Sequence, residues 1–417
     1  MIIMNSRTLF VWITSVAAGA VALRAAEPDR AVQLRGIVCF ATNQLALLEL
    51  QQGPPSQGEC ILGEGQRDGA LEVLKIDVAS GTVKVKNAGD ITELALKADA
   101  SSHTQDALSS INPRIGSSHR PYLRLEQAGS DSVFKVYQLL TLRSVIRCRD
   151  LPGFELDLFP KEAATPSDLA KALEQALAEK GVVLTPDRDK FTVAGGADDH
   201  GKITPQLWTL AAQLGGTVGH VSAGVPQETM PAGMIDFRKA DFNQVLLLYQ
   251  ELANRTVLRA ARFPTSNISF RSYTPLTRTE VIYALQAMFA ANDISIAPAG
   301  EKFLLLLPTA ETNRVAALLS RKPAVPAASK DGSMPAGAID CRMTPLGRVA
   351  EIYQGLTGRP VEMEPGLSSV RLTLRSQTEL TSGEALQALD LLLGLHGLSV
   401  APQDDGQGLK IVLLREH

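Results

Sequence analysis

The sequence predicts a multidomain α+β protein in which a small all-β domain is followed by repeats of a βαββα unit. An ungapped internal duplication, two capped helices in each copy and a run of short strands near the N-terminus carry this prediction. Residues 334–402 repeat residues 230–298 at a constant offset of 104 residues, and both copies open with Met-Pro-Ala-Gly. A match of this length without a gap indicates a duplicated structural unit.

The first repeat, residues 230–308, reads as one compact unit. A strand at 235–237 precedes a helix that Asp241 caps and whose apolar residues recur at helical spacing. A second helix begins at Thr277, and Glu280 three residues later completes a capping box. Strands at 256–260 and 267–272 lie between the helices, and a hairpin over 295–307 closes the unit, which gives the order βαββαββ.

The second repeat, residues 334–415, carries matching signals. Thr381 and Glu384 repeat the capping box, and Thr344-Pro345 predicts a capping hydroxyl followed by proline in the first helical turn. A linker over 309–333 separates the repeats, and its residues 314–319 predict a helical turn before a stretch of proline, alanine and serine.

Residues 1–26 have the layout of a secretory signal, because Arg7 precedes an uncharged apolar run over 9–22 that ends in small residues. We expect export to the periplasm, with cleavage after Ala22 or Ala26. A retained inner-membrane anchor is the alternative, although the run is short for a membrane span.

Residues 31–98 predict a small β domain, because six short strands alternate there with turn residues. Residues 99–120 are polar and rich in serine, which predicts a linker.

Residues 121–200 predict a mixed α/β module. Thr165-Pro166 begins a helix, and a hairpin around Pro186-Asp187 follows it. Helix, glycine, strand, turn and strand is also the end of both repeats, so this module is a candidate relative of them. Its first half does not align, and the fold of 121–165 stays open. Residues 201–229 predict a helical connector that begins at Thr204-Pro205.

The composition is that of a globular protein, with 45% hydrophobic residues and a formal net charge of −3. This charge gives no long-range reason to expect nucleic acid or an anionic membrane surface as a partner.

Two stretches carry a family resemblance, IDFRKADFNQVLLLYQELANRTVL and NISFRSYTPLTRTEVIYALQAMFAANDISIAP, together with their second-copy counterparts. They resemble the small KH-like periplasmic domains that stack into rings beneath the outer-membrane pore of bacterial secretins, in type II secretion and type IV pilus systems. The β domain is similar, more weakly, to the homology region of the type II secretion inner-membrane clamp protein, through RGIVCFATNQLALLEL, GECILGEG and LEVLKIDVASGTVKVKN.

The resemblance implies a non-enzymatic scaffold or docking component of a type II secretion or type IV pilus machine. Its partners would be secretin or pilus-assembly subunits, with a homo-oligomer as an open alternative and only indirect contact with the membrane machinery. The sequence ends at His417, directly after the last predicted strand, so we expect no pore-forming part. The alternative function is a periplasmic adaptor that binds a soluble ligand or the cell wall.

No pattern predicts catalysis, a cofactor or a metal site. Asp198-Asp199-His200 stands among glycines, which favours a loop over a metal-binding triplet. Residues 355–358 match the G-x-x-G of KH-type RNA modules, but the first copy lacks these glycines, so we interpret them as a helix stop.

Four residues at matching places in the repeats are candidates for partner contacts: Arg238, Arg342, Tyr249 and Tyr353. The arginines are the better candidates, with an exposed cross-strand ion pair as the alternative. The spacing of the tyrosines favours a core position over a partner contact.

Cys39 and Cys60 lie in the predicted β domain and are candidates for a disulfide if their strands are neighbours. Cys341 occupies a strand position that is Phe237 in the first copy, which favours a buried apolar role.

Overall fold

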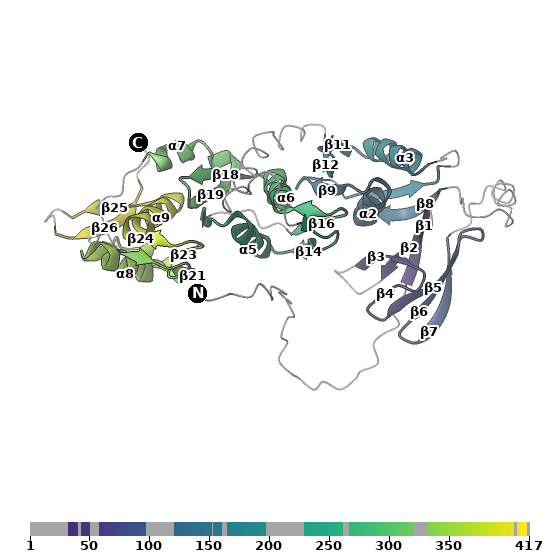
Figure 1. The fold of residues 1–417 in the computed structure, drawn as a ribbon, viewed down its shortest axis with the longest axis horizontal. Coiled ribbons are helices and arrows are strands. Elements are labelled where there is room, and N and C mark those ends of the chain that lie inside the picture. The colour runs from purple at the N-terminus through teal and green to yellow at the C-terminus, as the bar shows by residue number, and fades with distance from the viewer. Residues whose placement is uncertain are drawn as a thin grey trace, which may run out of the picture.

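The computed structural model describes residues 32–40, 43–50, 58–96, 121–151, 153–160, 165–196, 229–261, 267–320, 332–403 and 407–414. The predicted signal segment, the linker at 99–120, the connector from Thr204 and the triplet at 198–200 lie outside these residues. The fold is mixed α and β and consists of several small sheets with helices packed on them (Figure 1).

The N-terminal β domain contributes strands to two sheets. Its strands are β1 (Val32–Phe40), β2 (Asn43–Leu50), β3 (Gly58–Gly63), β4 (Arg67–Asp68), β5 (Leu71–Asp77), β6 (Thr82–Asn87) and β7 (Asp90–Ala95). Strands β4 to β7 form an antiparallel meander. Strands β1 to β3 belong to a sheet that continues into the next part of the chain, in the order β10-β8-β1-β2-β3.

Three units of similar build follow, which we call copy 1 (121–196), copy 2 (229–308) and copy 3 (332–414). Copy 1 contains β8 (Tyr122–Gly129), α2 (Ser130–Thr141), β9 (Ser144–Arg147), β10 (Glu155–Leu158), α3 (Pro166–Glu179), β11 (Val183–Asp187) and β12 (Phe191–Gly195). Figure 1 shows the copies in a row, with the β domain beside copy 1 and copy 3 at the opposite end.

Copies 2 and 3 repeat this element order with small additions. Copy 2 contains β13 (Thr229–Met230), β14 (Asp236–Ala240), α5 (Phe242–Ala253), β15 (Thr256–Arg259), β16 (Ile268–Arg271), β17 (Leu276–Thr277), α6 (Arg278–Ala291), β18 (Ile294–Ala299) and β19 (Phe303–Pro308). Copy 3 contains β20 (Ser333–Met334), β21 (Asp340–Pro345), α8 (Leu346–Thr357), β22 (Val361–Met363), η3 (Leu367–Ser369), β23 (Arg371–Arg375), β24 (Leu380–Thr381), α9 (Ser382–Leu395), β25 (Leu398–Pro402) and β26 (Leu409–Leu413).

Sheet topology is the same in all three copies. The strand before the first helix pairs antiparallel with the second strand after that helix, as β8–β10, β14–β16 and β21–β23. A three-stranded sheet has the orders β11-β12-β9, β18-β19-β15 and β25-β26-β22, with a parallel pair between its last two strands. Copy 1 is therefore a third repeat, including the first half that the sequence left open.

Copy 1 aligns with copy 2 at a constant offset of 112 residues, as Tyr137 against Tyr249 shows. A positive backbone φ angle also recurs at equivalent positions of the three copies. The residues before the first helix that adopt a positive φ are Gln127, Lys239 and Met343, at 47°, 52° and 51°. These are bulges, because the ladder register shifts beside each of them.

A tyrosine on the first helix and a polar side chain on the second helix bond inside every copy. The Tyr137 hydroxyl donates to Glu174 Oε1 over 2.9 Å, and Tyr353 donates to Asp390 Oδ1 over 3.0 Å. In copy 2, Gln286 Nε2 donates to the Tyr249 hydroxyl over 3.0 Å. These bonds fix the two helices of a copy against each other, because a buried hydroxyl requires a partner.

The helix starts that the sequence predicts from a capping side chain are as expected with one exception. Asp241 accepts a bond from Asn243 N, and the boxes at Thr165, Thr277 and Thr381 are complete. Thr344 does not cap α8, because it pairs with Leu372 in β21 and Pro345 takes the N-cap position. Gly358 ends α8 with φ 68°, so the helix-stop interpretation is confirmed.

The structure corrects one further local prediction, the turn in the copy 1 hairpin, and confirms another, the helical turn at 314–319. The turn of the copy 1 hairpin follows Asp187 rather than surrounding Pro186, because β11 runs through both residues. The start of the 309–333 linker is ordered as η2 (Thr309–Glu311) and α7 (Arg314–Leu319), and α7 packs on α9 through buried Leu318.

Candidate functional site: joints, end faces and a cleft

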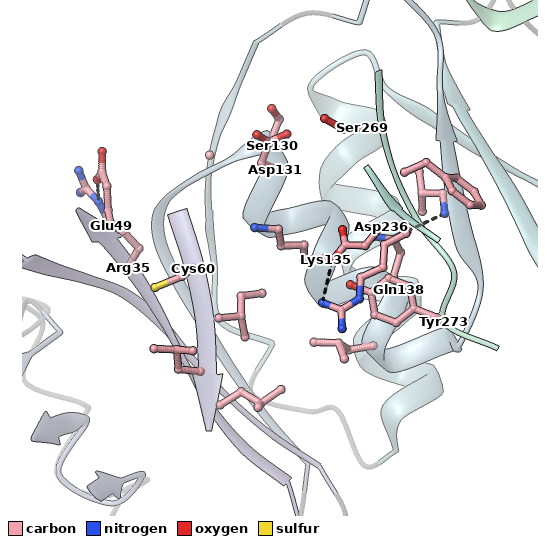
Figure 2. A pocket seen from close by; sticks show the side chains of 18 of the residues that line it. Arg35, Glu49, Cys60, Ser130, Asp131, Lys135, Gln138, Asp236, Ser269 and Tyr273 are labelled. Atoms are coloured by element: carbon pink, nitrogen blue, oxygen red, sulfur yellow. Dashed lines mark hydrogen bonds and ion pairs between the residues drawn. The ribbon is translucent and has the colours of Figure 1, made fainter. Parts of the chain in front are cut away.

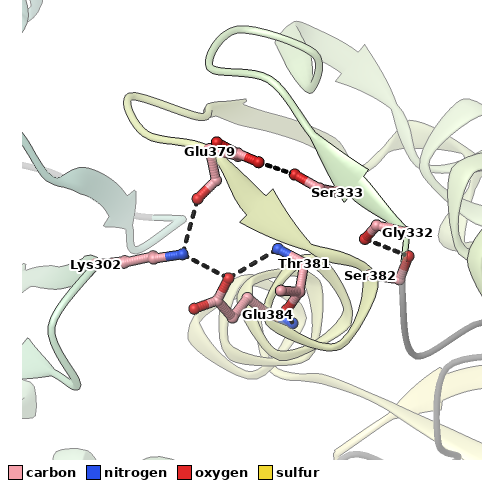
Figure 3. A network of polar contacts seen from close by, with 7 residues as sticks. All are labelled: Lys302, Gly332, Ser333, Glu379, Thr381, Ser382 and Glu384. Atoms are coloured by element: carbon pink, nitrogen blue, oxygen red, sulfur yellow. Dashed lines mark hydrogen bonds and ion pairs between the residues drawn. The ribbon is translucent and has the colours of Figure 1, made fainter.

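Successive copies are joined by a lysine at the tip of one hairpin and a capping glutamate of the next copy. Lys302 Nζ lies 2.7 Å from Glu384 Oε2 and donates to the Glu379 carbonyl over 2.8 Å. Figure 3 shows this lysine reaching from copy 2 between the two glutamates of copy 3. Burial opposes ionisation of Glu384, but Lys302 and the bonds from Thr381 outweigh it and lower the pKa of that carboxyl.

The joint between copies 1 and 2 has the same chemistry. Lys190 Nζ lies 2.8 Å from Glu280 Oε1 and donates to the Pro275 carbonyl over 3.0 Å. The first residue of the edge strand adds a second bond at each joint. Ser144 Oγ accepts from Tyr273 N over 3.2 Å, and Thr256 Oγ1 accepts from Gln377 N over 3.0 Å.

An apolar contact makes up the rest of each joint. We call the outer side of the three-stranded sheet of a copy its sheet face, and the outer side of its second helix its helix face. At each joint the sheet face of one copy packs on the helix face of the next copy. Leu258, Leu305 and Leu307 of copy 2 share a buried cluster with α9 of copy 3. Ile146 and Phe191 of copy 1 share another with α6, where the Phe191 and Tyr283 rings lie 5.6 Å apart.

This double packing explains the composition of the second helices. Ten of the 14 residues of α6 are buried, because its own copy covers one side and the copy 1 sheet covers the other. Only four of the 14 residues of α3 are buried, and its Lys171 and Gln175 are exposed where α6 has Tyr283 and Ala287. The helix face of copy 1 therefore lacks the apolar surface of a joint.

The sheet face of copy 3 lacks the joint chemistry as well. Glu362 and Glu364 stand where copy 2 has Leu258 and Ala260, and Lys410 has the register position of Leu305. Two further joint residues are also replaced, since Pro360 stands at the position of Thr256 and Gln407 at that of Lys302. Charged residues and proline at these positions are typical of the capping end of a repeat array.

A cleft of about 1990 Å³ separates the β domain from copies 1 and 2. Figure 2 shows Arg35, Glu49 and Cys60 on one wall, with Asp131, Lys135 and Tyr273 on the other. The cleft is lined by residues of both charge signs, and many of them pair within their own wall. Arg35 Nε lies 2.6 Å from Glu49 Oε2, and Arg147 pairs with Asp131.

The electrostatics of the cleft keep Asp131 ionised. Burial raises the pKa of this carboxyl, but the Arg147 guanidinium outweighs burial and holds the pKa below its usual range. Since acidic and basic residues both line the cleft, it has no single-sign field to select a charged small molecule. Its largely polar and charged lining suits a polar ligand better than an apolar one.

Tyr249 and Tyr353 were candidates for partner contacts, and this prediction is wrong. Both side chains are 0% exposed, because the helices of each copy enclose them. Burial and its acidic neighbour Asp390 also raise the pKa of Tyr353 far above the ordinary tyrosine value. Both tyrosines serve the core, which is the role that their helical spacing favoured over a partner contact.

The two candidate arginines lie on equivalent strands. Arg238 belongs to β14, and Arg342 belongs to β21. Arg342 is well exposed, and its guanidinium pairs with Asp340 of the same strand at 3.0 Å. This ion pair joins residues two apart along one strand instead of neighbours across strands.

Cys39 and Cys60 form no disulfide, so this prediction is wrong. They lie on β1 and β3, and β2 runs between these strands. Two strand spacings amount to about 9.5 Å, which exceeds the Cα separation that a disulfide spans. Cys341 is buried in copy 3, as its apolar position predicts.

The joint lysines were missed by reasoning from the sequence, although a signal was present. Tyr137-Gln138 matches Tyr249-Gln250 and Tyr353-Gln354 at the two offsets, and Lys190 matches Lys302. Identities in copy 1 are sparse, so the alignment becomes visible only when strand positions are known.

No protein family, curated protein or solved structure that was compared with the chain matches it. Within the ranges that the structure describes, no helix is long and apolar enough to cross a membrane. In the same ranges, no group of histidine, cysteine and acidic side chains has the geometry to hold a metal ion.

Proposed function

We propose that this protein is a non-enzymatic scaffold or docking component of an envelope-spanning secretion or pilus machine, built from secretin-type KH-like repeats. The observation that carries the proposal is the joint that recurs between copies 1, 2 and 3. The same lysine, hydroxyl and apolar sheet face recur at both joints. Because polar positions that recur between the copies hold successive copies together, the chain is suited to spacing and docking other proteins.

The shared sheet between the β domain and copy 1 supports the same function. Strand β1 pairs with β8 over four residue pairs, from Gly36–Leu125 to Cys39–Tyr122. A ladder of backbone hydrogen bonds fixes the β domain relative to copy 1 more rigidly than a flexible linker would. The shared sheet and the joints therefore connect the β domain and the three copies in a row, which would hold their docking surfaces at fixed separations.

In-cell cross-linking of a C-terminally tagged chain, followed by mass spectrometry, tests the proposal. We expect a secretin or a pilus-assembly subunit to dominate the cross-linked partners. Recovery of only wall fragments or unrelated periplasmic proteins would overturn it. The mature N-terminus from the same sample reports whether cleavage follows Ala22 or Ala26.

The cleft favours a second candidate function, a periplasmic adaptor that binds a soluble polar ligand or a cell-wall fragment. Its size of about 1990 Å³ and its polar lining support this candidate. Calorimetric titration of the full chain with soluble peptidoglycan fragments distinguishes the two functions. Saturable binding that is lost in Lys135→Ala would favour the adaptor.

A further inference from the structure

The β domain shows how an outer strand can be added to a copy. Strand β1 lies antiparallel along the outer edge of β8, on the side opposite β10. The fit is close, because a Cβ at Gly36 would lie 2.7 Å from the Arg124 carbonyl oxygen. Arg35 Nη1 also donates to Gln127, the bulge residue of β8, over 2.9 Å.

Copy 3 presents the equivalent edge without such a strand. Among the described residues, β21 pairs only with β23. The Ile339 carbonyl accepts from Ser376 N over 3.0 Å, so Ile339 uses the inner edge. Because antiparallel residues alternate between edges, the backbone groups of Asp340 point to the outer edge, as those of Arg124 do in β8.

Several other edge strands of the copies carry protection against added strands. Proline recurs in the outer hairpin strands β11, β18 and β25, as Pro186, Pro298 and Pro402. Proline in an edge strand removes an outward N–H and is a known device against pairing. Strand β22 has Pro360 before it and Pro365 shortly after it. Strand β21 has proline only at its last position, Pro345.

An exposed apolar side chain also lies at the outer edge of β21. The bulge residue Met343 is 59% exposed, which makes it one of the few large apolar side chains on the described surface. In copy 1 the bulge residue Gln127 is instead contacted from the β domain. Its counterpart in copy 2, Lys239, lines the cleft beside the β domain. Copy 3 therefore combines an open edge, an exposed apolar residue and no neighbouring β domain.

We propose that the outer edge of β21 is a strand-addition site, to which a partner protein adds an extended strand antiparallel, as β1 is added to β8. The partner strand is expected to carry a small residue opposite Cys341, where Gly36 lies opposite Leu125 in copy 1. An apolar side chain of the partner would cover Met343. This inference rests on the proposed docking function and names the surface that performs it.

Site-specific photocross-linking in the native cell tests the inference. A photoreactive residue replaces Met343 in one variant and Arg348, on the exposed side of α8, in another. We expect adducts from position 343 and at least about tenfold fewer from position 348, since strand pairing is short-ranged. Equal adducts from both positions would overturn the inference.

A matched pair of substitutions separates backbone pairing from side-chain contact. Asp340→Ala and Asp340→Pro both remove the carboxylate that pairs with Arg342, but only the proline removes the outward N–H. We expect Asp340→Ala to keep the adduct from position 343 and Asp340→Pro to lose it, with both variants folded by circular dichroism. Retention of the adduct in a folded Asp340→Pro variant would overturn strand addition.

If Asp340→Pro misfolds, hydrogen exchange of the unmodified full chain tests strand addition to β21 instead. In the cross-linked partner complex, the amides of Asp340 and Arg342 should exchange more slowly than in the free chain. Unchanged exchange at these amides would exclude strand addition. The identity of the adducted partner tests the proposed function separately, because strand addition to a protein outside secretion and pilus machines would refute that function alone.

Discussion

Lys302 of copy 2 and Glu384 of copy 3 form an ion pair of 2.7 Å although 82 residues separate them. Glu384 also completes the capping box of α9 with Thr381, so one carboxylate serves both a helix start and a joint between copies. Lys190 and Glu280 repeat this relationship one copy earlier. The position of one copy relative to the next is therefore set at the first turn of a helix, whose backbone is held in place by the capping box.

The dual role of Glu384 predicts unequal costs for its two partners. Lys302→Met should lower the free energy of unfolding by about 0.5–1 kcal/mol, because both side chains are about one-third exposed and solvent screens the pair. Glu384→Ala should cost about 1–2 kcal/mol, since it also removes the cap. Urea denaturation of the full chain measures both. Arg348→Met, which breaks an exposed pair with Glu351, is the control and should change little.

The apolar part of the joint predicts a larger effect. Leu305→Ala should lower the free energy of unfolding by about 2–4 kcal/mol, because Leu305 is fully buried between copies 2 and 3. Lys410→Ala alters the same register position in copy 3, where no copy covers the sheet, and should have little effect. Urea titration followed by hydrogen exchange at the copy 2 hairpin checks both variants. Similar losses would show that the two sheet faces are equally covered.

His396 predicts acid sensitivity of the second joint. Burial lowers the pKa of this imidazole to about 4, and its ring bonds to the Arg259 backbone in copy 2. Because the unfolded chain then binds more protons than the folded chain between about pH 6.5 and 4, stability should fall as the pH falls through this window.

The carboxyl pKa values of Glu280 and Glu384 are also lowered, so their contribution is lost in the same direction at lower pH. Urea midpoints at several pH values measure the combined slope. His396→Asn should flatten it between pH 6.5 and 4 and leave the more acidic part unchanged. An unchanged slope in that window would contradict the role of His396.

The close approach of β1 to β8 predicts opposite effects for two glycine substitutions. Gly36→Ala should destabilise the chain by about 1–3 kcal/mol, because its methyl group would meet backbone and side-chain atoms of β8. Gly355→Ala should stabilise it by about 0.5–1 kcal/mol, since Gly355 lies inside α8 with nothing within 4 Å of an added Cβ. Thermal melts of both variants beside the unmodified chain test the sign of each change.

Much of the fold could be predicted because its signals are local. The hairpins and the boxes at Thr277 and Thr381 depend on residues within a few positions of each other, and the duplication shows directly as a second copy of these signals. Thr344 shows the limit of such signals, because pairing with Leu372 drew it into a strand and moved the helix start. Of the candidate site, the sequence placed Arg342 on a strand, and the helical spacing of the two tyrosines favoured the core position that they occupy.

By itself, the sequence determined the element types and the period of the repeats, because caps, turns and apolar spacing act over three or four residues. Only the tertiary structure decided that copy 1 is a third repeat, that Cys39 and Cys60 are separated by a strand, and which faces are covered. The joints connect residues as far apart as Ser144 and Tyr273, 129 positions along the chain. Such contacts depend on how the chain packs, because many different side chains can form an apolar joint of the same shape.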